Sequence, residues 1–194
     1  MLPVTGVVLA AGASTRMGES KLTLVYRGTT VLNATIAAVE ASMVTRVIVV
    51  TGCDAEPVET SIESDSVTVV RNPDYRRGNM SSLLAATAHE PDADAFILVA
   101  GDLPTIRTTA IDALVGIWEE KEPWAAVTAY RDRVAHPFLL SRDAVEAAAS
   151  MTGERVLWRV LVDPGDNRVV RIAAGANAPR DLNTPEDYKA LLKE

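Results

Sequence analysis

LAAGASTRMGESK, residues 9–21, is the stretch that decides the fold, and it begins at the last residue of an apolar run at residues 4–9. The apolar run predicts a strand leaving a hydrophobic core, and the small residues after it leave the backbone uncovered. Exposed backbone N–H groups at a strand-to-loop junction can bind phosphate oxygens. Arg16 would add a planar pair of donors, and Lys21 a mobile point charge. The stretch therefore predicts an anion-binding loop, against the alternative of an ordinary turn with two solvated cations.

The spacing of the glycines argues against two familiar phosphate-binding loops. A Walker A loop needs G-x-x-x-x-G-K-[ST], whereas Gly12 and Gly18 are separated by five residues and Gly18 is followed by Glu19. The dinucleotide fingerprint G-x-G-x-x-G needs two further glycines that the sequence after Gly12 lacks. We therefore expect neither a P-loop protein nor a Rossmann dehydrogenase.

Composition narrows the class of protein. With 194 residues, of which 48% are hydrophobic, the chain is long enough for one sizeable core and short for two, so we predict a single domain over residues 1–194. A net charge of −7 argues against nucleic acid and anionic lipid as partners. The apolar runs are too short to span a bilayer, and no basic segment precedes the first, which predicts a soluble, cytoplasmic protein. The single cysteine, Cys53, excludes an intrachain disulfide.

Strand-like and helical patterns alternate along the first half of the chain. Predicted strands span residues 4–9, 46–51, 67–70 and 95–100, and predicted helices span residues 31–42, 55–64 and 81–89. The second half is less regular, with predicted helices at 108–120, 142–149 and 154–162 and predicted strands near 125–129, 138–140 and 168–172. A last helix is predicted after Thr184 as N-cap, with Pro185 at its first position. The alternation predicts a mostly parallel sheet covered by helices on both faces.

Three predicted strands end in residues that suit a ligand site, because parallel sheets bind ligands beyond the carboxyl ends of their strands. These ends are residues 10–12, Thr51-Gly52 and Gly101-Asp102. Asp102 has a short side chain held at the end of a buried strand, and Gly101 would let a ligand approach closely. A hard cation prefers such an oxygen ligand, but a helix cap or Asx-turn is an equally good interpretation of Asp102.

The pattern L-A-A-G-x-S-x-R-M-G-x-x-K resembles the signature of the MobA-like NTP transferase superfamily, and it is closest to the molybdenum cofactor cytidylyltransferase branch. Every fixed position of that pattern is filled in residues 9–21. The resemblance implies a three-layer α/β/α, Rossmann-like nucleotide-diphospho-sugar transferase fold with a mostly parallel mixed sheet. Together with the strand ends, it predicts these nucleotide-binding residues: Leu9, Ala10, Ala11, Gly12, Arg16, Lys21, Thr51, Gly52, Ser82 and Gly101.

The resemblance also implies a Mg²⁺ site. The family carries G-D-x-P at the place of residues 101–104, and its aspartate is the main Mg²⁺ ligand, which favours Asp102 as a ligand here. A second carboxylate is expected because Mg²⁺ seldom binds one protein oxygen alone. Residues 181–187 resemble the family segment D-[IVL]-[ND]-T-P-E-D, so Asp181 is the predicted second ligand. Asn183 is the alternative, unless it is only a turn residue.

Two further segments resemble parts of the family's binding site. Residues 72–83 resemble N-x-x-[YW]-x-x-G-M-x-x-S-L, which lies against the base and ribose, and this implies a role for Ser82 rather than a helix cap alone. Asn79 departs from that pattern. His136 and the proline after it resemble the family's G-H-P, on the side that receives the second substrate, although Ala135 replaces the glycine. A lone histidine is otherwise more often a packed or surface residue.

The reaction implied by the resemblance is nucleotidyl transfer, in which an acceptor phosphate attacks the α-phosphorus of a nucleoside triphosphate and pyrophosphate leaves. Arg16 is predicted to bind the β- and γ-phosphates and Lys21 the α-phosphate, and with Asp102 they form the predicted catalytic set. Such a reaction needs no protein nucleophile and depends on positioning and charge neutralisation.

The choice of substrates also follows from the resemblance. The guanylyl branch usually reads L-A-G-G, so Ala11 favours CTP over GTP. A molybdopterin-type acceptor is expected, with a molybdoenzyme as a further partner. Two alternatives within enzymes are transfer to a sugar phosphate or a relative recruited to redox chemistry. A non-catalytic chaperone that delivers molybdopterin is the alternative from another class.

Overall fold

The computed structural model describes residues 3–14, 17–151, 155–162 and 167–193. These residues form a seven-stranded sheet in the order β5-β4-β1-β6-β8-β7-β9. Its strands are β1 (Val4–Ala10), β4 (Arg46–Thr51), β5 (Thr68–Arg71), β6 (Ala95–Ala100), β7 (Ala125–Ala129), β8 (Val134–Ser141) and β9 (Val169–Ala173). Neighbouring strands run parallel except at β8, which is antiparallel to both β6 and β7. The sheet is therefore mixed and mostly parallel, as predicted.

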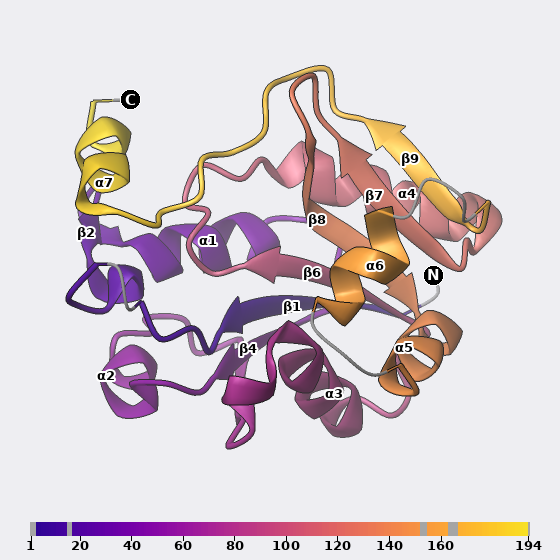
Figure 1. Ribbon diagram of the computed structural model, residues 1–194, viewed down its shortest axis with the longest axis horizontal. Coiled ribbons are helices and arrows are strands. Elements are labelled where there is room, and N and C mark those ends of the chain that lie inside the picture. The colour runs from indigo at the N-terminus through magenta and orange to yellow at the C-terminus, as the bar shows by residue number, and fades with distance from the viewer. Residues whose placement is uncertain (1–2, 15–16, 152–154, 163–166, 194) are drawn as a thin grey trace.

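Helices cover both faces of this sheet (Figure 1). One layer consists of α1 (Val31–Glu40), α2 (Ala55–Thr60) and α4 (Thr108–Lys121), and the other of α3 (Asn79–His89), α5 (Arg142–Ala149) and α6 (Val156–Val162). Successive side chains of a strand point to opposite faces, so in β1 Val8 packs into the first layer and Val7 into the second. The three-layer α/β/α fold is confirmed.

A small accessory cluster holds the C-terminal segment against the hairpin that follows the loop after β1. It contains the hairpin of β2 (Val25–Tyr26) and β3 (Thr29–Thr30), the 3₁₀ helix η1 (Lys21–Thr23) just before it, and α7 (Pro185–Leu191). Tyr26, Val31, Leu182 and Leu191 are buried together there. The cluster therefore brings the residues that precede α7 next to the loop that follows β1.

The predicted elements agree best with the structure at the centre of the sheet. The strands β4, β6 and β7 and the helix α5 span the predicted residues. The strand β8 is longer than the predicted residues 138–140 because Val134 and Ala135 also pair with β7 and Ser141 also pairs with β6. The predicted helix at 55–64 ends earlier, at Thr60. The β2–β3 hairpin was not predicted.

The start of α7 follows the predicted capping signal. The hydroxyl of Thr184 accepts a hydrogen bond from Asp187 N at 3.2 Å, and the Asp187 carboxylate accepts one from Thr184 N at 2.9 Å. Pro185 occupies the first turn. No helix within the described ranges is long and apolar enough to cross a bilayer.

Candidate active site

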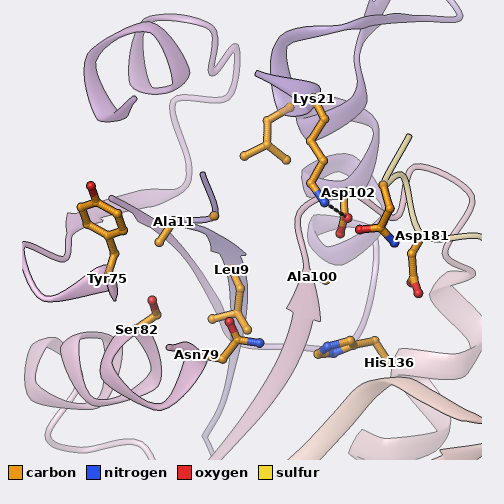
Figure 2. Close-up of a pocket in the computed structure, with 13 residues that line it drawn as sticks. Leu9, Ala11, Lys21, Tyr75, Asn79, Ser82, Ala100, Asp102, His136 and Asp181 are labelled. Atoms are coloured by element: carbon orange, nitrogen blue, oxygen red, sulfur yellow. Dashed lines mark hydrogen bonds and ion pairs between the residues drawn. The ribbon is translucent and has the colours of Figure 1, made fainter. Parts of the chain in front are cut away.

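A cavity of about 320 Å³ lies at the carboxyl edge of the sheet, where β1 and β6 end and α3 begins. Figure 2 shows Tyr75 and Ser82 on one side of it and Lys21, Asp102 and Asp181 on the other. The predicted site residues that it brings together are Leu9, Ala11, Gly12, Lys21, Ser82, Asp102, His136, Asp181 and Asn183. Leu22, Tyr75, Asn79 and Ala100 also line it and were not predicted.

Lys21 carries the positive charge of the β1 loop into this cavity. Its Nζ forms an ion pair with the Asp102 carboxylate and donates a hydrogen bond to Leu182 O at 2.8 Å. The Lys21 and Asp102 side chains are only 17% and 12% exposed, so the pair is largely shielded from solvent. The backbone N of Lys21 also donates to Ser14 Oγ at 3.2 Å, which closes the loop on itself. The loop thus delivers a cation to the end of β6.

The peptide before Asp102 is fixed on both sides. Gly101 N donates to Leu9 O at 3.0 Å, and Gly101 O accepts from the Thr35 hydroxyl at 3.1 Å. A Cβ atom on Gly101 would lie 3.0 Å from Leu9 O and 3.2 Å from Leu32 Cδ1. Gly101 therefore allows close packing of protein on protein, and it holds the Asp102 carboxylate at a constant position.

Asp181, in the segment that precedes α7, lies on the same side of the cavity as Asp102. Its side chain is 50% exposed, and its Oδ2 lies 3.9 Å from Arg133 Nη2. Partial burial raises the pKa of the Asp181 carboxyl, and the nearby charge of Asp102 raises it further, while Arg133 opposes the shift. Two neighbouring carboxylates repel each other, and a cation shared between them would relieve that repulsion.

The donor set at this position suits a divalent cation. The Lys21 ammonium occupies a position that such a cation could take. It is bound there by the Asp102 carboxylate and by Leu182 O, which are both hard oxygen ligands. Among the described residues, no group of three or more His, Cys, Asp or Glu side chains could hold a metal ion. Asp102 and Asp181 alone would leave most coordination positions to water and substrate phosphates, as Mg²⁺ usually requires.

Three of the predicted nucleotide-binding residues lie behind the wall of the cavity. Ala10 and Thr51 are fully buried, and the Thr51 hydroxyl donates to Glu59 at 2.6 Å. A Cβ atom on Gly52 would lie 2.8 Å from Ala11 Cβ and 2.7 Å from Tyr75 Cβ. Gly52 therefore lets Tyr75 approach β1, and the surface that a ligand would meet is made by Ala11 and Tyr75.

The first turn of α3 supplies polar groups to the cavity. Ser82 Oγ accepts a hydrogen bond from Asn72 Nδ2 at 3.1 Å, which leaves the Ser82 hydroxyl free to donate to a ligand. Asn79 lies between Leu9 and His136 (Figure 2). In the sequence, Asn79 stands out only as a departure from the family pattern. The signal that identifies it is Gly78, whose φ of 92° starts the helix and turns its first residues toward the strand ends.

His136 lies in β8 at the other end of the cavity. Its Nδ1 is 3.0 Å from Leu98 O, and since a carbonyl only accepts, Nδ1 carries the hydrogen and Nε2 keeps its lone pair. Burial lowers the pKa of His136 more than this hydrogen bond raises it, so the imidazole is neutral near pH 7. His136 also lines an adjoining cavity of about 290 Å³, which is mostly apolar and includes Phe138 and Trp158.

Arg16, predicted to bind the β- and γ-phosphates, lies outside the described residues. The described parts of the same loop turn sharply at Ser14, which has a φ of 43° and accepts a hydrogen bond from Met17 N at 2.9 Å. A Cβ atom on Gly12 would meet no atom within 4 Å, so the backbone there borders open space. That part of the loop can therefore be approached by a ligand.

A model of the MobA-like NTP transferase domain matches residues 6–169. The chain belongs to this family. Molybdenum cofactor cytidylyltransferase from Escherichia coli is 29% identical over 189 residues, which cover 97% of this chain and 95% of the relative. Nicotine blue oxidoreductase from Paenarthrobacter nicotinovorans is 31% identical over 202 residues, which cover 97% and 96%. The predicted family is confirmed, and its members differ in reaction.

Solved structures show the same architecture. Rv0371c from Mycobacterium tuberculosis superimposes with a TM-score of 0.88 at 31% identity, over 100% of this chain and 98% of the other. A second structure of that protein, in complex with manganese, gives a TM-score of 0.84 at 29% identity, over 99% of each chain. The fold that holds the candidate site is therefore common to relatives along the whole described chain.

Proposed function

We propose that this protein transfers a nucleoside monophosphate, CMP in preference to GMP, from a nucleoside triphosphate to a phosphorylated acceptor of the molybdopterin type. The observation that carries the proposal is the meeting of Lys21, Asp102 and Asp181 in one cavity at the carboxyl ends of β1 and β6. A cation and two carboxylates there suit a crowded polyphosphate with its metal. Among the described residues that line the cavity, no serine or cysteine is hydrogen-bonded to a base, so direct transfer between phosphates fits it best.

The proposed reaction forms one bond and breaks one. An acceptor phosphate oxygen attacks the α-phosphorus in line, the bond between the α-phosphorus and its bridging oxygen to the β-phosphate breaks, and pyrophosphate leaves. Lys21 would bind the α-phosphate as charge builds up, and Arg16 would bind the departing phosphates. Ser82 and the start of α3 would hold the base and ribose. Losing one such electrostatic contact typically costs about 10²-fold or more in rate.

Asp102 and Asp181 would hold a divalent cation, with Asn183 as the alternative second ligand. Mg²⁺ is the proposed ion, and the manganese complex of the mycobacterial relative supports a divalent cation of this kind. When bound, it would supply positive charge to the phosphates. The Lys21 ammonium now pairs with Asp102, so we expect Lys21 to turn from that carboxylate to the α-phosphate when the metal and nucleotide arrive.

The preference for CTP is supported by Ala11. Its side chain lines the cavity on the side of Tyr75 and Ser82, and the methyl group occupies space that a glycine would leave to a larger base. The name of the Escherichia coli relative agrees with this choice.

The acceptor would lie in the adjoining apolar cavity. That cavity shares Leu9, Asn79, His136 and Asp181 with the first, so an acceptor placed there can present its phosphate to the α-phosphorus. Its remaining wall includes Leu98, Phe138 and Trp158, against which the face of a flat heterocyclic ring could stack. This is the observation that favours a molybdopterin-type acceptor over a sugar phosphate, whose hydroxyl groups would find few partners there.

A second candidate function is an oxidoreductase reaction in the same cavities. It is favoured by the nicotine blue oxidoreductase, which is as similar to this chain as the cytidylyltransferase is. An intact set of Lys21, Asp102 and Asp181 supports transfer, since a hydride reaction has no need of two carboxylates beside a cation that would bind phosphate.

A pyrophosphate-release assay with the purified protein tests the proposal. The protein is incubated with Mg²⁺, molybdopterin and each nucleoside triphosphate in turn, and with CTP in the absence of acceptor as the control. Release with CTP that depends on molybdopterin is the expected result. Release only with GTP would indicate a guanylyltransferase, and release only with a sugar phosphate would indicate a sugar-phosphate nucleotidyltransferase. No release with any pair, together with tight binding of molybdopterin, would replace the proposal with a chaperone role.

A further inference from the structure

A third cavity, of about 520 Å³, lies beyond Asp181 and shares no lining residue with the catalytic cavity. It is bounded by residues 105–107, by the turn between β7 and β8, and by residues 177–180 of the long connection from β9 to α7. Figure 1 shows this connection passing over the tip of β7 and β8. Its walls carry three arginines, Arg107, Arg133 and Arg180.

The charge of this cavity is opposite to that of the whole chain. Asp132 is the only carboxylate among the described lining residues, and it is already engaged by Ala178 N at 2.8 Å and by Arg133 Nη1 at 3.1 Å. Arg107 is exposed and makes no ion pair or side-chain hydrogen bond within the described residues. A chain with a net charge of −7 thus concentrates three guanidinium groups around one hollow.

The walls of the cavity are held in place by specific bonds. Arg131 N donates to Ala176 O at 2.9 Å, and Arg133 Nη2 donates to Pro179 O at 2.9 Å. Tyr130, at the base of the turn, donates its hydroxyl to His136 O at 2.9 Å. Burial raises the pKa of Tyr130 to about 12 although Arg107 and Arg133 oppose the shift, so the phenol stays neutral and does not offset the arginines. The cavity is therefore a fixed, positively charged hollow.

Arg133 connects this cavity to the catalytic one. Its guanidinium lies at the wall of the basic cavity, while Nη2 is 3.9 Å from Asp181 Oδ2. This is longer than its bonds to Asp132 and Pro179, so the contact with Asp181 is the easiest to give up. A guanidinium can bind a tetrahedral oxyanion through two parallel N–H groups, and an anion in the cavity would compete for it with Asp181.

We propose that the cavity of Arg107, Arg133 and Arg180 is a second anion-binding site, for a phosphate monoester or a similar oxyanion, and that its occupancy strengthens divalent-cation binding at Asp102 and Asp181. The coupling rests on the proposed function, since it takes Asp181 as a metal ligand. An anion neutralises positive charge that repels the metal, and it draws Arg133 away from the Asp181 carboxylate. By linkage, the metal strengthens anion binding by the same factor.

Equilibrium binding without nucleotide tests the proposal. Sulfate serves as the probe because it is tetrahedral and binds Mn²⁺ weakly, and free Mn²⁺ is measured by its electron paramagnetic resonance signal. We expect millimolar sulfate to lower the Kd for Mn²⁺ several-fold in the unmodified protein. Arg107→Gln should remove most of this effect. The matched control is Arg131→Gln, which changes the same charge in the neighbouring turn outside the cavity and should keep the effect.

Three results would overturn the proposal. They are an Mn²⁺ affinity that does not respond to sulfate, a response lost equally in Arg107→Gln and Arg131→Gln, and a response lost in Lys21→Ala but kept in Arg107→Gln, which would place the sulfate at the nucleotide loop. Failure of the proposed metal site looks different. In that case Asp102→Asn would leave Mn²⁺ binding unchanged even without sulfate.

The source of the anion is decided by kinetics with the two variants. If the anion is part of the acceptor, Arg107→Gln raises the KM for the acceptor and Arg131→Gln does not. If it is a free anion that regulates the site, the KM for the acceptor is unchanged, and activation by sulfate at low Mn²⁺ is lost in Arg107→Gln alone. Absence of both effects contradicts a role for this cavity.

Discussion

The two sides of the candidate site are built differently. On the nucleotide side, Leu9 lies near the end of the central strand β1 and Asp102 follows the end of its parallel neighbour β6, and a backbone hydrogen bond from Gly101 joins those ends. On the acceptor side, His136 comes from the antiparallel strand β8, and Asp181 comes from a connection outside regular secondary structure. The first side is fixed by the sheet, whereas the second is fixed by individual side-chain and capping contacts.

This difference explains how one family can contain members with different reactions. The residues of a sheet edge that binds phosphates cannot be substituted freely, because a substitution there disturbs the core behind it. A connection held by contacts such as Arg133 to Pro179 can change without such a cost. We therefore expect substitutions on the nucleotide side to abolish turnover with any acceptor. Substitutions on the acceptor side, apart from the proposed metal ligand Asp181, should alter which acceptor is used.

The largest effect is expected from Lys21→Ala on the nucleotide side. It should lower kcat by about 10²-fold or more for every acceptor, because it removes a charge that meets the α-phosphate in the transition state. Pyrophosphate release measures the rate, and circular dichroism with thermal unfolding checks the fold. Lys189→Ala, which removes an exposed lysine in α7, is the control. A Lys21→Ala variant that keeps full activity would break the assignment.

The same residue allows a test of the metal site. Because the Lys21 ammonium stands where a cation would bind to Asp102, Lys21→Met should tighten Mn²⁺ binding to the nucleotide-free protein by about tenfold, the equivalent of about 1.4 kcal/mol. Isothermal titration calorimetry with Mn²⁺ measures the change. A Kd equal to or weaker than that of the unmodified protein would show that Lys21 does not compete with the metal.

A smaller and more selective effect is expected from His136→Ala on the acceptor side. Loss of one hydrogen bond to Nε2 should raise the KM for the acceptor by up to about tenfold and leave the KM for CTP unchanged. His89→Ala, the other histidine of the chain, is the control. If His136→Ala changed the KM for CTP and not that for the acceptor, the two sides would have been assigned the wrong way round.

The pH dependence gives a further readout for His136. Since burial lowers its pKa from the ordinary 6.5, the imidazole is neutral throughout the range above pH 6.5. The KM for the acceptor should therefore stay constant there and rise only as the pH falls below that value, when Nε2 is protonated and can no longer accept a hydrogen bond. A KM that already rises between pH 8 and 7 would contradict a neutral His136.

Ala11→Gly tests the choice of base with a modest expected shift. Removing one methyl group should improve the use of GTP relative to CTP by about threefold to tenfold, at the low end of what one methylene contributes to specificity. The ratio of kcat/KM for the two nucleotides measures it. Ala13→Gly is the control, since Ala13 is exposed in the same loop. An unchanged ratio would remove the role of Ala11 in selecting the base.

The smallest effect is expected from Thr184→Ala, which removes the N-cap of α7. It should lower the free energy of unfolding by about 1 kcal/mol, measured by denaturant titration. The acceptor side would then lose its fixed geometry before the nucleotide side does. The KM for the acceptor should therefore rise, while the KM for CTP does not. Equal changes in both KM values would show that the two sides are not mechanically separate.

Much of the fold could be predicted because the central strands are continuous apolar runs that end abruptly. The strands β4 and β6 coincide with their predicted residues for this reason. The β2–β3 hairpin was missed because strands of two residues have no measurable alternation. Most of β8 was missed because its first half, from Val134 to His136, is only partly buried and lacks a continuous apolar pattern.

The sequence by itself determined the family, the order of the helices and of the strands in the main sheet, and the loop of residues 9–21, because a buried strand followed by small residues and spaced cations is a local pattern. It also singled out Asp102, two residues after the end of β6, although only the resemblance to the family favoured a metal ligand there over a helix cap. Only the tertiary structure decided which strand-end residues line the cavity. Thr51 turns inward to Glu59, and Asn79 turns into the cavity. Asp181 reaches the cavity of Asp102 only because α7 packs against the β2–β3 hairpin and the start of α1. Side-chain direction and contacts between distant segments depend on packing, which a local pattern does not contain.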